Sequence, residues 1–341
     1  MRKKKSRLLG SCDFFLYLST MKRFVTILLM LLTMMPMMAQ WLHEGDTIAI
    51  ISPSSATDTA TVNGGIRTLE RWGFHTVVSR CALRDYRGFA GTIEERRNDL
   101  IWALQNPSVK AVMCSRGGDG AVHLLCELSP DFFRKYPKLL IGFSDITALL
   151  SAEACVGNVG IHGSMCHAIA TYEGNDTVSQ ALRRMLLGQL HEYHVDAHPL
   201  NQKGKASGIL VGGNMSVLHG LAGSAYDPLT LPEIILFVED TGEGMTKVDR
   251  MLHNIEVRGL MSHIKGVIIG QISSYKKVPN TFQDMNYMFH EYLRKYGIPV
   301  CYNFPVGHAH LRNFPMLVGS KAPLEVTGEG VTLTFRPSPS Y

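Results

Sequence analysis

Residues 138–150 constrain the fold most strongly, because their sequence, KLLIGFSDITALL, predicts a buried strand that turns directly into a helix. The apolar run at 139–141 is typical of a strand buried on both faces of a parallel sheet. Apolar residues then recur at the i, i+3, i+4 spacing of a helix packed on a sheet. Ser144 lies at the turn, so we expect its hydroxyl to project from the sheet edge.

Ser144 has two interpretations. It can be a nucleophile, because the amide of the next residue, Asp145, begins a helix whose positive dipole end can stabilise an oxyanion. It can also be a simple N-cap of that helix, with Asp145 favourable in the first turn. Ile146 replaces the second glycine of the usual G-x-S-x-G elbow, so the turn alone favours the cap.

Strand and helix patterns alternate through the first half of the chain. Strands are predicted at 47–52, 74–78 and 109–113, and helices at 62–69 and 92–104. This alternation predicts a parallel sheet covered by helices, of a flavodoxin-like or amidotransferase-like type. On the helix at 92–104 we place Arg96, Arg97 and Asp99 on the polar side.

The second half of the chain has a different pattern. Strands are predicted at 208–211, 233–238, 266–272, 300–304 and 324–335, and long helices only at 246–256 and 281–296. We therefore expect a second, β-rich α/β domain, with the active site at the interface of the two domains. The predicted division is a leader at 1–39, an N-terminal domain at 40–166, a connection at 167–206 and a C-terminal domain at 207–341.

A glycine-rich loop follows the strand at 109–113. Its sequence, SRGGDG at 115–120, holds three glycines in four positions. Open α/β sheets bind ligands at the carboxyl ends of their strands, and glycine lets a backbone amide approach a ligand closely. A plain tight turn is the alternative. Because the next strand along the chain ends at Ser144, we expect the loop to lie beside that serine.

The start of the chain resembles a secretory leader. Met21, Lys22 and Arg23 precede an apolar run at 24–38, which is shorter than the roughly twenty residues that span a membrane. We predict a signal peptide at 21–39 and cleavage after Ala39, with either Met1 or Met21 as the start. The mature protein is then expected to be exported, periplasmic and soluble, without stable membrane insertion.

Composition excludes some partners. The leader holds seven of the 34 Lys and Arg residues and one of the 29 Asp and Glu residues, so the rest of the chain is nearly neutral. With no basic stripe among aromatic residues, we expect no nucleic-acid partner.

Six of the seven cysteines follow the leader without a C-x-x-C pair, so we expect buried thiols rather than a disulfide framework. No cofactor is expected.

Five motifs occur in an order that is similar to that of a known family. They are CSRGGDG at 114–120, GFSD at 142–145, VEDTGE at 238–243, VDRML at 248–252 and FPVGH at 304–308. Together they resemble the LD-carboxypeptidase family of serine peptidases, which includes murein tetrapeptide carboxypeptidases and microcin-C immunity hydrolases. The resemblance covers roughly residues 44–335, and agreement of several separate motifs in order is specific.

The resemblance implies a catalytic triad. Ser144 would be the nucleophile, Glu239 the orienting carboxylate and His308 the general base. The backbone amides of Gly118 and Asp145 would form the oxyanion hole. Such a base is needed because a serine hydroxyl is a weak nucleophile at neutral pH.

Substrate contacts are expected from Arg116, Gly117, Asp119 and Asn214. Arg116 precedes the glycines and is the nearest candidate for binding a terminal carboxylate. An ion pair with Asp145 is its alternative role. Most relatives have tyrosine where this chain has Asp119, so we expect a different pocket rim.

Other residues compete for these roles. Asp240 and Glu243 are rival partners for the histidine. His308 and His310 could also be two metal ligands, completed by His162 or a carboxylate, but no H-E-x-x-H motif or cysteine pair supports a metal, and we predict none. We expect His162 to be a structural or pocket-lining residue.

The leading functional prediction is a serine carboxypeptidase that hydrolyses the L,D-peptide bond to a C-terminal D-amino acid, as in D-alanine release from murein tetrapeptides. The alternatives are a non-catalytic two-domain periplasmic binding protein and a peptidyl-nucleotide amidase of the microcin-immunity type. An exported protein would not meet the cytosolic conjugate of the latter. The sequence does not decide whether the stem peptide contains diaminopimelate or lysine, or whether the protein is a monomer or a homodimer.

Overall fold

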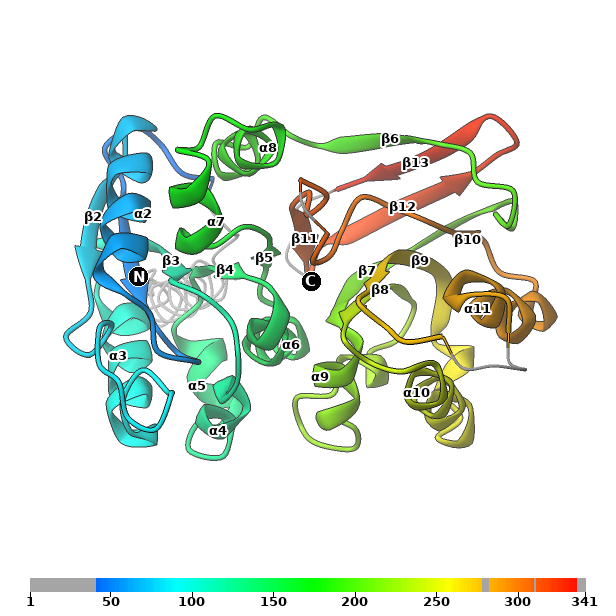
Figure 1. Cartoon of the computed structure of the whole chain (residues 1–341), viewed down its shortest axis with the longest axis horizontal. Coiled ribbons are helices and arrows are strands. Elements are labelled where there is room, and N and C mark those ends of the chain that lie inside the picture. Colours follow the sequence, from blue (N-terminus) through cyan, green and yellow to red (C-terminus); the bar gives the residue numbers. More distant parts are fainter. Residues whose placement is uncertain (1–40, 278–281, 310, 336–341) are drawn as a thin grey trace, which may run out of the picture. The chain divides into compact units, whose positions relative to one another are not determined.

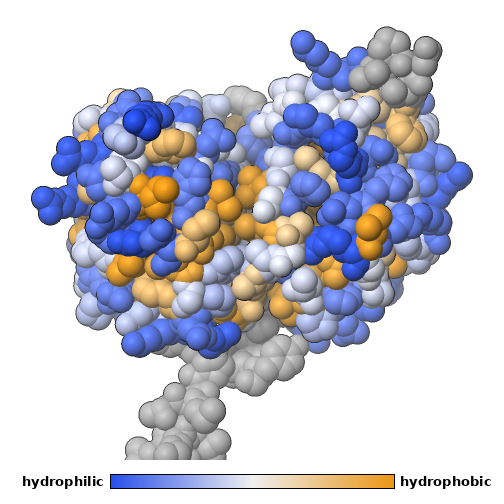
Figure 2. Space-filling model, turned by 90° about the horizontal axis from the view of Figure 1, so that it is seen from below, coloured by the Kyte–Doolittle hydropathy of each residue, from blue (hydrophilic) through white to orange (hydrophobic). Residues whose placement is uncertain are grey.

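The computed structural model describes residues 41–277, 282–309 and 311–335, which form two sheets covered by helices (Figure 1). The predicted leader and signal peptide lie outside the described residues. Within those ranges, no helix is both long and apolar enough to cross a membrane. The face seen in Figure 2 is mainly hydrophilic, with hydrophobic residues in small groups.

The first sheet has the strand order β11-β5-β4-β3-β1-β2, and only the β11–β5 pair is antiparallel. Its strands are β1 (Thr47–Ile51), β2 (His75–Val78), β3 (Val109–Cys114), β4 (Leu139–Gly142), β5 (Gly160–His162) and β11 (Met316–Val318). Its helices are α2 (Thr59–Arg71), α3 (Ile93–Gln105), α4 (Ala121–Leu125), α5 (Pro130–Lys135), α6 (Thr147–Cys155), α7 (Cys166–Thr171) and α8 (Thr177–Leu186). The order 2-1-3-4-5 of its parallel strands is flavodoxin-like, as the sequence predicts, and ligands of such sheets bind at the carboxyl ends of the strands.

The second sheet has the order β10-β9-β8-β7-β12-β13-β6, parallel from β10 to β7 and antiparallel beyond. Its strands are β6 (Glu192–Asp196), β7 (Gly204–Asn214), β8 (Ile234–Thr241), β9 (Ile264–Ser273), β10 (Val300–Cys301), β12 (Lys321–Val326) and β13 (Gly330–Thr334). Its helices are α9 (Met215–Gly220), α10 (Met245–Val257) and α11 (Met285–Leu293). The expectation of two α/β sheets is confirmed.

Two sequence predictions of individual elements are wrong. The helix expected at 281–296 begins only at Met285, because Asp284 caps it by accepting from Tyr287 N. Phe282, which was placed in the apolar stripe, is 43 % exposed. The strand expected at 324–335 is a hairpin of β12 and β13.

The predicted domain limits stay a prediction. Each sheet, however, includes a strand from outside the domain expected to form it. Strand β11, from near the end of the chain, completes the first sheet beside β5. Strand β6, from the expected connection at 167–206, forms the edge of the second sheet. Helix α8 and all but the first residue of α7 also lie in that expected connection, and α7 packs against α2. The chain therefore crosses between the sheets several times.

Candidate active site

Ser144 lies at a sharp turn between β4 and η1 (Ser144–Ile146), which leads into α6. Its φ of +62° falls in the left-handed region, which is uncommon and strained for a residue other than glycine. Gly142 permits the turn, since a Cβ there would lie 2.7 Å from Ile146 Cγ2. The residue at the N-cap position is Phe143, so the interpretation of Ser144 as a simple cap is wrong.

An unbroken hydrogen-bonded chain joins Ser144 to two residues of the second half. His308 Nε2 lies 3.0 Å from Ser144 Oγ, and His308 Nδ1 lies 2.6 Å from Glu239 Oε2. Glu239 lies on β8, and His308 lies on the loop between β10 and β11. The structure thus brings together the three predicted triad residues, in the order that proton transfer from a serine requires.

Burial strongly affects the pKa values of Glu239 and His308 in this hydrogen-bonded series. The Glu239 side chain is fully buried and the His308 side chain is 19 % exposed. Burial raises the pKa of Glu239, while its hydrogen bond with His308 opposes the rise. Burial lowers the pKa of His308, but the hydrogen bond and charge of Glu239 outweigh this effect, so the pKa of His308 is raised above its ordinary value. The protonated imidazole of His308 is therefore stabilised, and a general base that has taken a proton from a serine needs this stabilisation.

The glycine-rich loop packs against the nucleophile turn. A Cβ on Gly117 would lie 3.0 Å from Ser144 Cβ and 3.4 Å from the Phe143 carbonyl oxygen. Gly118 has a φ of +115°, and a Cβ there would overlap Ser55 Oγ. Position 118 therefore requires glycine, position 117 leaves only a tight fit for a Cβ, and the loop lies beside Ser144 as predicted.

The Asp145 side chain ties these two segments together. Its Oδ2 accepts from Ser54 Oγ at 2.6 Å and from Ala121 N at 2.8 Å, at the start of α4. Ser55 Oγ accepts from Asp119 N at 3.1 Å. The two serines follow the carboxyl end of β1, where ligands of such sheets bind, so this position was the signal that could have identified them.

Arg96 lies beneath the glycine-rich loop, and the sequence prediction placed it wrongly. It is 1 % exposed rather than solvated, and its Nη1 donates at 2.7 Å to both the Pro53 and Gly120 carbonyl oxygens. Its guanidinium also lies 5.1 Å from the centre of the Phe89 ring. Arg96 thus clamps the loops after β1 and β3, a role that helix periodicity does not reveal.

The predicted substrate residues differ in their surroundings. Arg116 is exposed. Among the described residues it forms no ion pair with Asp145, its alternative role, and the Asp145 carboxylate accepts from Ser54 and Ala121 instead. Arg116 Nη1 lies 3.4 Å from the Ala56 carbonyl oxygen. Asp119 is also exposed. Both side chains therefore lie where a ligand can reach them, while their binding role stays a prediction.

Asn214 is engaged by its own protein neighbours. It is 6 % exposed and caps α9, with Oδ1 accepting from Val217 N. Its Nδ2 donates to Asp240 Oδ1 at 3.1 Å, and Ser216 N donates to Asp240 Oδ2 at 2.8 Å. Its predicted contact with substrate gains no support from these bonds, and Asp240 anchors α9 rather than orienting the histidine.

The remaining competitors have other partners. Glu243 pairs with Lys247 at 3.0 Å. His162 is fully buried, and its Nε2 lies 3.2 Å from Asn313 Oδ1. Among the residues with assigned positions, no group of three or more His, Cys, Asp or Glu could hold a metal ion. His310 lies outside the described residues.

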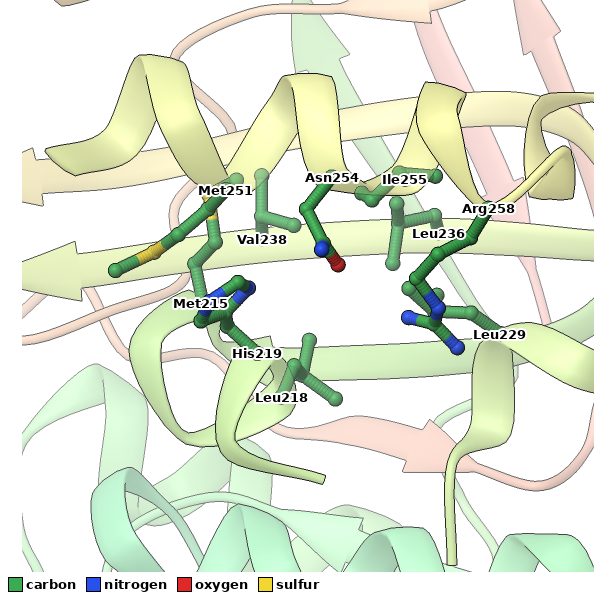
Figure 3. Close-up of a pocket in the computed structure, with 10 residues that line it drawn as sticks. All are labelled: Met215, Leu218, His219, Leu229, Leu236, Val238, Met251, Asn254, Ile255 and Arg258. Atoms are coloured by element: carbon green, nitrogen blue, oxygen red, sulfur yellow. The ribbon is translucent and has the colours of Figure 1, made fainter. Parts of the chain in front are cut away.

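A separate pocket lies between α9, α10 and β8, with an empty volume of about 310 Å³ that includes its open mouth (Figure 3). Leu236 and Val238 line it, and they alternate along β8 with Glu239, so they point away from the triad. Arg258 at its rim is paired with the buried Asp227. This pocket is therefore distinct from the candidate active site.

Comparisons with known proteins agree on one family. The model of the LD-carboxypeptidase N-terminal domain matches residues 48–163, and that of the C-terminal domain matches residues 207–324. A murein tetrapeptide carboxypeptidase from Pseudomonas aeruginosa is 32 % identical over 84 % of this chain and 95 % of that protein. The microcin C7 self-immunity protein of Escherichia coli is 25 % identical over 88 % and 96 %. The crystal structure of a muramoyltetrapeptide carboxypeptidase from Oxalobacter formigenes superposes with a TM-score of 0.78 at 28 % identity, over 86 % of this chain and 100 % of that one.

Proposed function

The chain belongs to the LD-carboxypeptidase family and is a serine-type peptidase, and from this premise we propose that it hydrolyses the L,D-peptide bond to a C-terminal D-amino acid. D-Alanine release from a murein tetrapeptide, during recycling or remodelling of peptidoglycan, is the specific reaction. The observation that carries the proposal is the contact chain from Glu239 through His308 to Ser144, with distances of 2.6 and 3.0 Å.

In the proposed reaction, His308 takes the hydroxyl proton of Ser144 while Oγ bonds to the carbonyl carbon of the L-residue. The carbonyl oxygen becomes an oxyanion, for which the amides of Gly118 and Asp145 are the proposed donors. His308 then passes the proton to the amine of the departing D-amino acid as the peptide bond breaks. Water hydrolyses the remaining ester on Ser144, with His308 again as the base.

A carboxypeptidase must also bind the terminal carboxylate of its substrate. Arg116 is our candidate, because its guanidinium is exposed and it directly precedes Gly117, which packs on Ser144. A charge-assisted hydrogen bond from arginine suits a carboxylate. The negative charge of Asp119 on the same loop opposes the attraction between Arg116 and the substrate carboxylate. Most relatives are expected to have tyrosine at this position.

Chiral analysis of the released amino acid tests the proposal. Purified protein is incubated with tetrapeptide stems that end in D-alanine, in L-alanine or in an amidated D-alanine, each with diaminopimelate or lysine at the third position. We expect free D-alanine from the first substrate only, and none from the variant Ser144→Ala. Equal release of L-alanine, or faster hydrolysis of a peptidyl-nucleotide conjugate, would contradict the proposed specificity.

A further inference from the structure

We propose that His162 and Asn313 form a positioning pair, which holds the loop bearing His308 in register with the sheet bearing Ser144. The inference rests on the proposed triad and deepens it. Neither residue of the pair is placed against the reacting atoms. Their effect would be exerted through the position of the general base.

The pair lies where the two halves of the site meet. His162 ends β5, where it is in register with Gly142 at the end of β4, two residues before Ser144. On its other side it pairs with Met316 of β11, directly after the loop at 302–315 that carries His308. His162 therefore contacts both the nucleophile strand and the strand that ends the loop.

The direction of each hydrogen bond follows from the chemistry of the donors. Gly307 N lies 3.3 Å from Asn313 Oδ1. Because a backbone amide can only donate, Asn313 Oδ1 is the acceptor. His162 Nε2 lies 3.2 Å from the same oxygen and must therefore carry the proton. The histidine is then the neutral Nε2–H tautomer and acts as a donor.

The surroundings keep His162 in that form. It is 0 % exposed, and its ring packs edge-to-face on Phe237, with centres 5.1 Å apart. The ring of Phe143 lies 5.8 Å from it and 5.0 Å from His308. Burial, and then the charge of His308, lowers the pKa of His162 to about 3. It therefore stays neutral while His308 gains a proton during the reaction.

The bond to Gly307 matters because this glycine directly precedes His308. A Cβ on Gly307 would lie 2.9 Å from Gln271 Cβ and 3.1 Å from Glu239 Cβ, so its backbone packs tightly against the stem of the Glu239 side chain. Asn313 holds the amide of that backbone. Loss of the bond would let the loop shift, and a displacement of about 1 Å can slow a positioned reaction by roughly a hundredfold.

The test compares His162→Phe, which retains a ring but no donor, with His162→Gln, which retains a donor. Asn313→Leu removes the acceptor without removing bulk. The measurements are kcat and KM on the tetrapeptide, and the rate at which a fluorophosphonate probe labels Ser144. We expect His162→Phe and Asn313→Leu to lower kcat and the labelling rate by about tenfold to a hundredfold, with KM nearly unchanged. His162→Gln should recover most of the loss.

The double variant His162→Phe/Asn313→Leu should lose little beyond Asn313→Leu alone, because His162 acts on the loop only through Asn313. Val318→Ala, in the buried part of β11, is the matched control. It should lower Tm without lowering the labelling rate at a temperature where it is folded. Wild-type labelling rates in both His162→Phe and Asn313→Leu, or losses that His162→Gln does not relieve, would overturn the positioning role. A wild-type enzyme that does not react with the probe would instead contradict the proposed triad.

Discussion

The two halves of the candidate site are held in place by different combinations of forces. The nucleophile half consists of the glycine loop and the Ser144 turn, where close backbone packing at Gly117 and Gly118 adds to the hydrogen bonds of Asp145 and Arg96. The base half consists of Glu239 and the loop at 302–315, and it is held by hydrogen bonds between buried polar side chains.

This difference predicts different responses to change. Steric repulsion rises steeply as two atoms approach each other and does not depend on pH, so the closely packed backbone of the nucleophile half should respond to added atoms. Hydrogen bonds between buried ionisable groups depend on charge, so the base half should respond to pH and to removal of donors or acceptors. Five experiments break or sharpen this contrast.

The largest effect should come from removing the contact that joins the halves. Ser144→Ala and His308→Ala should each lower kcat by about a thousandfold or more, and the double variant should lose little beyond that. The reason is that the hydroxyl and the imidazole act on one proton. Steady-state kinetics on the tetrapeptide measures this, and multiplicative losses would argue against a shared proton transfer.

A single methyl group should damage the nucleophile half. Gly118→Ala forces a Cβ into Ser55 Oγ and moves a proposed oxyanion donor, so we expect kcat to fall by roughly a hundredfold to a thousandfold. Gly45→Ala is the matched control, because Gly45 also has a positive φ, +87°, but no atom within 4 Å of the added Cβ. Equal losses in both variants would mean that backbone strain alone is responsible.

A smaller effect is expected at the rim of the nucleophile half. Arg116→Gln should raise KM for the tetrapeptide by about tenfold, corresponding to the loss of one charge-assisted hydrogen bond. The amidated tetrapeptide, which lacks the carboxylate, should be nearly unaffected. If both substrates lose equally, or if a fall in Tm accounts for the loss, Arg116 stabilises the loop rather than binding the substrate.

The base half should set the acid limb of the pH profile. Because Glu239 raises the pKa of His308 above 6.5, the neutral base is lost as pH falls through that raised value. The acid limb of kcat/KM should therefore have an apparent pKa above 6.5. In Glu239→Gln it should move to lower pH, along with a large loss of activity. If the acid limb does not move in Glu239→Gln, it reports the titration of a group other than His308.

The last effect is on stability rather than activity, and it concerns α6, the helix that follows the Ser144 turn. Glu153 on α6 is fully buried, and burial raises its pKa from 4.5 to about 8. The folded state therefore holds a proton that the unfolded state releases above about pH 4.5, so this group lowers the free energy of unfolding as pH rises towards 8. Glu153→Gln should be near wild type at pH 5 and more stable by on the order of a few kcal/mol at pH 9. Urea unfolding at the two pH values measures the difference.

Much of the architecture follows from short-range patterns. Apolar runs and their spacing predicted the strands before Gly117 and Ser144, and the alternation of strand and helix predicted the parallel sheet. The helix over residues 245–257 was also predicted within a residue at each end. The hairpin of β12 and β13, the edge strand β6 and the short strand β11 were not predicted, because their positions depend on pairing with strands that are distant in the chain.

By itself, the sequence determined the order of the motifs and the turn at Ser144, because these depend on neighbouring residues. The family resemblance favoured Glu239 over Asp240 and Glu243, and the tertiary structure places the Glu239 carboxylate against the histidine. Only the tertiary structure decided the burial of Arg96 and the contact of His162 with Asn313. The bonds concerned join residues 69, 164 and 151 positions apart, and contacts over such separations depend on how the two sheets pack.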